Sequence, residues 1–188
     1  TTSLGTVQSV GSYLPGPDVL ETQINWQHVA IGKLVKQDSL GPTSGQGTLR
    51  VTQLLKESRS IDVATTLEEA SYGKLEVRQL HAAGTYQSPR FNGVIRSEQA
   101  GFSFDLQTEG QFKEVLQWQG RGILRDLDLK KWAGTPSEVH LTAPIAWSGQ
   151  IPLDQLTQAT GYIQLDQAQW RKEGELTNTQ PMRLDVQR

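Results

Sequence analysis

Apolar and polar residues alternate along most of the chain, with the period of two that is typical of a β-strand with one buried face. Leu20, Thr22, Ile24 and Trp26 share one face of such a segment, and Glu, Gln and Asn stand between them. Similar segments recur to the C-terminal end, and glycine-centred turns separate them about every eight to twelve residues. The pattern predicts roughly ten to thirteen antiparallel strands and an all-β meander.

Helical patterns are short and few. They are expected only near residues 29–34, 129–133 and 152–158, each over one or two turns. Glycine-rich and proline-containing stretches such as 40–47 and 134–137 are expected to be long loops. Residues 1–188 are therefore expected to form a single β-rich unit, with a subdivision considered at 134–137.

A weak internal repeat connects these features. Four strand patterns run into a short apolar closure that ends in a bulky residue, at 29–34, 127–132, 151–156 and 163–170. In each copy the alternation stops, and one helical turn is expected to pack the bulky residue back over the end of the sheet. The copies are unevenly spaced, so the sequence does not indicate a strict solenoid.

Composition excludes several classes of function. Lys plus Arg number 18 and Asp plus Glu 20, a net charge of −2, which gives no electrostatic basis for binding nucleic acid. Cysteine is absent, which excludes disulfides, thiolate metal sites and a cysteine nucleophile. No window of about 18 apolar residues predicts a membrane-spanning helix. Because the sequence begins at Thr1, we expect it to be a fragment of a longer chain.

No group of residues has the spacing of a catalytic, cofactor or metal site. The histidines are isolated from one another, without metal-ligand spacing. The paired carboxylates are expected on solvated turns or on a polar face, not in acid–base catalysis. The chain is therefore predicted to be non-enzymatic, with no cofactor. The candidates considered were His28, His81, His140, Glu68, Glu69, Asp126 and Asp128.

The five tryptophans allow two interpretations. Aromatic side chains exposed in a row would form a platform for sugar rings. Trp26, Trp118 and Trp147 instead belong to apolar strand faces, whereas Trp132 and Trp170 end repeat-like segments. Packing within the protein is the favoured interpretation.

Part of the chain resembles the TamB and AsmA-like proteins of Gram-negative envelopes, most closely the TamB-like proteins of Bacteroidetes. The resemblance rests on GTY at 84–86, FNGVIRS at 91–97, GFSFDL at 101–106 and LDLKKW at 127–132. It covers roughly residues 45–132. Residues 14–34 form a preceding segment of the same kind, and residues 137–188 fit only as further alternating strands.

The resemblance implies a long antiparallel sheet curled into a groove, or taco, with an apolar concave face. Its implied role is lipid transport between membranes or outer-membrane biogenesis, from a periplasmic location in the cell envelope, with the parent chain anchored in a membrane. The implied partners are phospholipid acyl chains, the remaining repeats of the parent chain and an outer-membrane assembly factor.

The residues themselves support a groove but leave a second fold open. A curled antiparallel sheet can present a continuous apolar strip from every second residue. The same alternation would also suit a closed β-sandwich, which would be a carbohydrate- or protein-binding module. The side chains expected to line a lipid groove are Leu75, Val77, Phe102, Phe104, Leu106, Ile123 and Leu127.

Overall fold

The structure is a computed structural model that describes residues 5–34, 40–56, 58–72, 75–99, 102–130, 137–153, 158–172 and 175–187. Strands account for 78% of these residues, which confirms the predicted all-β class. Helix α1 covers Ile31–Leu34. The strands are β1 (Thr6–Leu14), β2 (Val19–Val29), β3 (Thr43–Thr52), β4 (Ser60–Tyr72), β5 (Leu75–Gln87), β6 (Arg90–Gln99), β7 (Phe102–Phe112), β8 (Val115–Asp128), β9 (Val139–Pro152), β10 (Thr160–Leu165), β11 (Gln169–Lys172), β12 (Glu175–Asn178) and β13 (Met182–Gln187).

The chain forms two compact units. Unit 1 holds residues 1–87 and 97–99, and unit 2 holds 88–96 and 100–188. The chain passes from one unit to the other after Gln87, Arg96 and Gln99, at the start and the end of β6. Residues 131–136 lie outside the described part of the chain.

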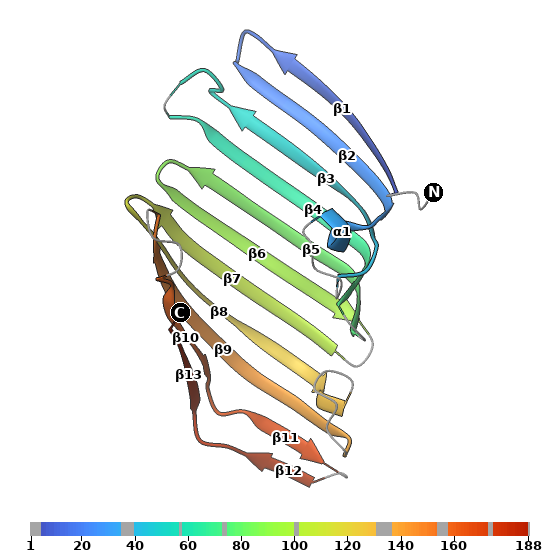
Figure 1. The fold of residues 1–188 in the computed structure, drawn as a ribbon, viewed down its shortest axis with the longest axis vertical. Helices are drawn as coiled ribbons and strands as arrows, with labels where there is room; N and C mark the ends of the chain where they lie inside the picture. The colour runs from blue at the N-terminus through green and yellow to red at the C-terminus, as the bar shows by residue number, and fades with distance from the viewer. Residues whose placement is uncertain are drawn as a thin grey trace. The chain divides into compact units, whose positions relative to one another are not determined.

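Unit 1 is an antiparallel meander in which β1 to β5 pair in chain order (Figure 1). Residues directly opposite one another point to the same face of a sheet, so the register shows which side chains share a face. Trp26, Ile24 and Leu20 fall on one face with Val51 and Leu49 of the next strand. The amide and charged residues between them fall on the other face.

Unit 2 continues the same pattern with β6, β7, β8, β9, β10 and β13 in this order. The long strand β9 pairs with β10 along residues 145–150 and with β11 along residues 139–142. Strands β13 and β12 then pair with β10 and β11 respectively. Within unit 2, β10 and β11 therefore form one antiparallel hairpin with β12 and β13 (Figure 1). The first arm of this hairpin is interrupted at residues 166–168.

No second sheet covers the meander in the part of the chain that the structure describes, so the closed β-sandwich, the alternative fold, is not found there. The exposed area agrees with a single layer. The chain exposes 13015 Å². Two compact domains of about 10 kDa each would together expose only about 10,800 Å². Most apolar side chains are accordingly half-buried, and few are buried completely.

Aromatic side chains cover glycines on neighbouring strands. Trp118 lies opposite Gly149, and Trp147 lies opposite Gly120. A Cβ atom added to either glycine would come within 2.2 Å of the facing indole ring. In unit 1, Trp26 covers Gly45 in the same way. This arrangement confirms that these three tryptophans pack within the protein.

Two of the predicted repeats have the same local structure. The register of β2 shifts between Trp26 and Val29, and that of β8 shifts between Leu124 and Leu127. Each shift contains a residue in the left-handed region, His28 with φ 50° and Asp126 with φ 56°. The backbone N–H of each donates a hydrogen bond of 3.0 Å, to Ser44 Oγ and Thr142 Oγ1 respectively.

Helical backbone begins three residues after each bulge, at Ile31 in α1 and at Leu129. The helix predicted at 29–34 is therefore confirmed, whereas most of the one predicted at 129–133 lies outside the described residues. The third site is also only partly described, because residues 154–157 are outside it. At the fourth site, the strand breaks at 166–168 without helix and resumes as β11.

The tryptophan–glycine packing predicts a cost for any side chain at Gly120. In Gly120→Ala, the new methyl group would meet the Trp147 ring at 2.2 Å and the backbone oxygen of Gln107 at 2.6 Å. We expect a loss of about 1–3 kcal/mol in the free energy of unfolding, measured by urea denaturation. Gly16→Ala is the matched control, because no atom lies within 4 Å of its added Cβ. Equal stability of the two variants would contradict this packing.

Candidate functional site

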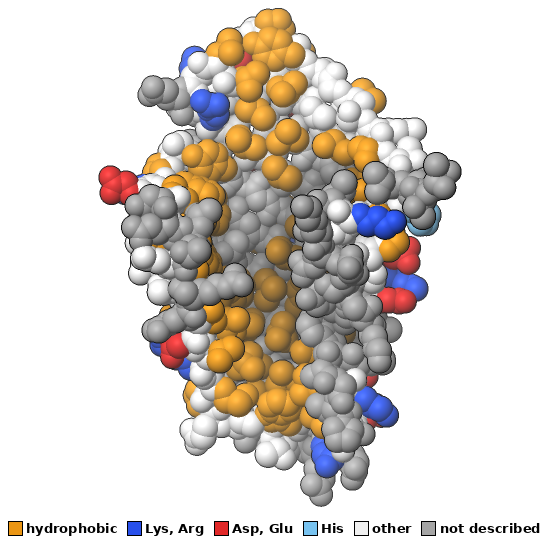
Figure 2. All heavy atoms as spheres, in the orientation of Figure 1, with side chains coloured by type: hydrophobic (Ala, Val, Ile, Leu, Met, Phe, Trp, Pro, Cys, Tyr) orange, Lys and Arg blue, Asp and Glu red, His pale blue; other side chains and the backbone are white. Residues whose placement is uncertain are grey.

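One face of the sheet in unit 2 carries mainly apolar side chains, and we call it the apolar face. Register places it on alternate residues of β7 to β10 and β13. The space-filling view shows hydrophobic side chains gathered on the viewed face (Figure 2). The apolar face consists of Phe102, Phe104, Leu106, Phe112, Leu116, Trp118, Leu124, Leu127, Leu141, Ala143, Ile145, Trp147, Ile151, Ile163, Leu165, Met182, Leu184 and Val186.

The opposite face of unit 2 is its polar face. It carries amides such as Gln117 and Gln150, which lie opposite one another on β8 and β9. Gln119 donates a hydrogen bond of 2.7 Å to Glu109 across β7 and β8. The two faces differ this sharply because each strand contributes alternate residues to them.

Four of the predicted lining residues lie together on the apolar face: Phe102, Phe104, Leu106 and Leu127. The phenyl rings of Phe102 and Phe104 are in contact, with their centroids 5.4 Å apart. Phe102 and Leu127 belong to a buried cluster with Leu141, and Phe104 packs against it.

The prediction for Ile123 is wrong. Ile123 lies opposite Asp105 and Pro144, so it belongs to the polar face. The sequence places Ile123 and Leu127 on one face because they are four residues apart. The bulge at Asp126 adds one residue between them and reverses the alternation, so Leu127 shares its face with Leu124 instead.

The two remaining lining residues belong to unit 1. Val77 is half-buried and lies opposite Ala70 on β4. The backbone of Leu75 pairs with Tyr72, and the side chain of Leu75 is outside the described part of the structure. These two residues are therefore not part of the apolar face of unit 2.

The apolar face is covered at one end and open at the other. At one end, Phe102, Leu127, Leu141, Ala143 and Ala168 are buried. Towards β10 and β13 its side chains are exposed: Ile163 by 42%, Leu184 by 64% and Val186 by 45%. Exposed apolar side chains that are contiguous on one face are typical of a surface that binds a protein, a membrane or a ligand.

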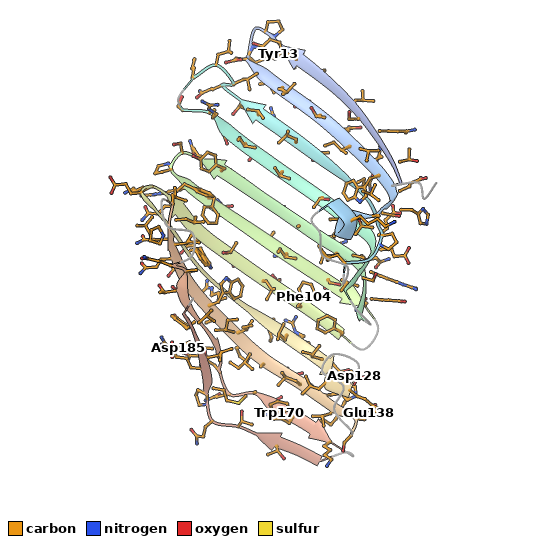
Figure 3. The ribbon with its side chains drawn as sticks, in the orientation of Figure 1. Tyr13, Phe104, Asp128, Glu138, Trp170 and Asp185 are labelled. Atoms are coloured by element: carbon orange, nitrogen blue, oxygen red, sulfur yellow. The ribbon has the colours of Figure 1, made fainter. Side chains whose placement is uncertain are left out.

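An ionic cluster lies beside the covered end. His140 Nδ1 is 3.1 Å from Asp126 Oδ1, and His140 Nε2 is 3.1 Å from Glu138 Oε1. Arg171 of β11 donates a hydrogen bond of 2.8 Å to the same Asp126 oxygen. Figure 3 shows Glu138 and Asp128 at the same end of the sheet as Trp170. The cluster joins three strands at the point where the bulge disturbs the ladder.

The cluster raises the pKa of His140. The hydrogen bond with Glu138 is the main cause, and the charge of Asp126 adds to it, while burial and Arg171 act in the opposite direction. Asp128 also lies directly opposite His140. In the sequence, His140 is isolated from the Asp126–Asp128 pair, and only the fold brings it to these carboxylates. The arrangement is an ion-pair network between strands.

The other candidates remain apart. The ring of His81 is 3.0 Å from the Thr66 hydroxyl, and His28 occupies the bulge of β2. Glu68 and Glu69 are exposed. Among the residues described, no group of His, Asp and Glu could hold a metal ion. No helix in the described ranges has the length and hydrophobicity needed to cross a membrane.

Comparisons of this chain with protein-family models, with curated proteins and with solved structures found no match.

The ionic cluster predicts a pH-dependent stability. Because the pKa of His140 is raised in the folded state, its protonation stabilises the fold below the unfolded value of about 6.5, and this contribution is lost as pH rises through the folded pKa. NMR titration of His140 should give a pKa above about 6.5, and Glu138→Gln should lower it. Glu114→Gln, in the β7–β8 turn, serves as a control that should leave it unchanged. A His140 pKa insensitive to Glu138→Gln would contradict the role of this cluster.

Proposed function

We propose that this chain is a non-enzymatic module of a TamB/AsmA-like envelope protein, and that its apolar sheet face carries phospholipid acyl chains. The observation that supports the proposal is the apolar face of unit 2, which leaves Ile163, Leu184 and Val186 exposed on a sheet without a second layer. The resemblance over roughly residues 45–132 supports the choice of protein class.

The chemistry of the apolar face suits an acyl chain. Backbone N–H and C=O groups of inner strands are paired with neighbouring strands, so a hydrocarbon chain would meet few unsatisfied polar groups. Trp118 and Trp147 fill the space over Gly149 and Gly120 and so cover backbone that would otherwise be bare. Each Å² of apolar surface removed from water contributes about 25 cal/mol, so a chain lying along several strands gains from contact alone.

The remaining parts of the proposal follow from the same class of protein. The module works in the periplasm, within a longer chain that is anchored in a membrane, and contributes to lipid transport or to outer-membrane biogenesis. Its protein partners are the other repeats of that chain and an outer-membrane assembly factor. The competing sandwich module needs a second layer over the apolar face, and the described strands do not supply one.

The test is site-specific photocrosslinking on β10. Ile163 lies on the apolar face and Thr160 on the polar face of the same strand. With p-benzoylphenylalanine at position 163, the protein should form covalent adducts with phosphatidylethanolamine in vesicles, and mass spectrometry should detect them. The same group at position 160 should form few, because that side chain points away from bound lipid. Equal adducts from both positions, or none from position 163 in folded protein, would refute the proposal.

Charge placed on the apolar face should also reduce lipid binding. Ile163→Asp is expected to lower the amount of phospholipid retained after incubation with vesicles, because a carboxylate among acyl chains is desolvated. Since Ile163 is already 42% exposed, the free energy of unfolding should fall by only about 1 kcal/mol. Thr160→Asp adds the same charge to the polar face and should retain lipid as the unmodified protein does.

A further inference from the structure

Three adjoining hollows mark unit 2, with volumes of about 690, 580 and 550 Å³. The first and second share Asn92, Glu109 and Gln119. The second and third share Gln107 and Arg121. Together the hollows form one continuous depression that crosses β6 to β10, and we call it the trough.

The trough opens on the polar face. Gly110 and Gly149 line the first hollow, but on the apolar side the rings of Phe91 and Trp118 occupy the space over them. At the third hollow, Leu106 covers Gly122 on the apolar side. Asp105 and Gln107, the residues on either side of Leu106 in β7, line this hollow and point to the polar face. A twisted sheet curves in opposite senses along its two diagonals, so each face can be concave.

The side chains that line the first hollow of the trough are mostly neutral hydrogen-bonding groups. Gln117, Gln119, Gln150 and Thr160 lie in the first hollow, and each amide offers both a donor and an acceptor. Charged side chains of both signs also line the trough: Arg90, Arg121, Asp105, Glu109 and Asp166. Asp105 is 3.1 Å from Arg96, and Glu109 accepts a hydrogen bond from Gln119. Because positive and negative side chains are mixed along the trough, it presents neither a strongly positive nor a strongly negative surface to a ligand.

The amides are also held in place. Gln111 donates a hydrogen bond of 2.8 Å to Gln117 across β7 and β8, and Gln119 donates one of 2.7 Å to Glu109. Each cross-strand bond uses one donor or acceptor of the amide group and holds that group in place. The remaining donors and acceptors of the same amides can face the trough. Such preorganisation reduces the entropy lost when a ligand orders the side chains. Five strands at a spacing of about 4.8 Å give the trough a span of about 19 Å.

We propose that the trough binds a neutral oligosaccharide. A sugar chain carries many hydroxyls that both donate and accept hydrogen bonds, which matches a row of fixed amides and hydroxyls without net charge. Its elongated form matches a depression that crosses five strands. This site lies on the face opposite to the proposed lipid surface, so the two proposals are independent.

The experiment titrates the full chain with chitohexaose and with maltohexaose, monitored by isothermal calorimetry. At least one of them should bind saturably, with a Kd of about 1 mM or tighter. The double variant Gln117→Ala/Gln150→Ala should weaken binding about tenfold, because it removes facing amides from the first hollow. Gln23→Ala is the matched control. Gln23 is an exposed amide on the polar face of unit 1, and its removal should leave the Kd unchanged.

Each alternative outcome has a definite meaning. If neither sugar binds up to about 10 mM while circular dichroism shows a folded β protein, the proposal is wrong. Binding that the double variant leaves intact would place the site outside the trough and overturn the proposal. Tighter binding of a heparin hexasaccharide than of either neutral probe would show that charge, and not hydroxyl recognition, governs the site.

Discussion

Backbone pairing between neighbouring antiparallel strands is the interaction on which this structure depends. A chain of this length normally stabilises itself around a thick hydrophobic core, but here only Val19, Val29, Val51, Phe102, Leu127, Leu141, Ala143 and Ala168 are buried apolar residues within the described ranges. The ladders of β2 to β5 and β7 to β9 satisfy the backbone groups, and cross-strand pairs such as Trp118 with Gly149 bury what a single layer can. Every other property of the protein follows from this one-layer construction.

A single layer leaves both faces available, and alternation makes them chemically different. No second sheet covers the apolar face within the described ranges, and its end on β10 and β13 is exposed. The polar face carries amides that bond to one another across strands, which gives it order that an ordinary solvated surface lacks. The two proposed ligands, an acyl chain and a neutral sugar chain, would therefore bind on opposite sides of the same strands.

Bulges limit how far the regular ladder extends. At His28 and at Asp126 one extra residue enters the strand. The backbone N–H of that residue donates a hydrogen bond to a hydroxyl of the next strand. Helical backbone begins three residues later. In unit 2 this position is reinforced by the contacts of Asp126 with Arg171 and His140. The ionic cluster thus stabilises a point where backbone pairing is interrupted.

The sequence by itself determined the all-β class, the antiparallel meander and the two-sided character of the strands, because a period of two is a local property of the extended backbone. It also indicated the closures at 29–34 and 127–132, and it placed Phe102, Phe104, Leu106 and Leu127 on one face. It misassigned Ile123, since a bulge reverses alternation and depends on the hydroxyl of Thr142 in another strand. Only the tertiary structure decided that the chain divides into two units, that tryptophans cover glycines, that His140 meets Asp126 and Arg171, and that the polar face is hollowed. These features depend on which strands become neighbours and in which register, and contacts between residues far apart in the chain set both.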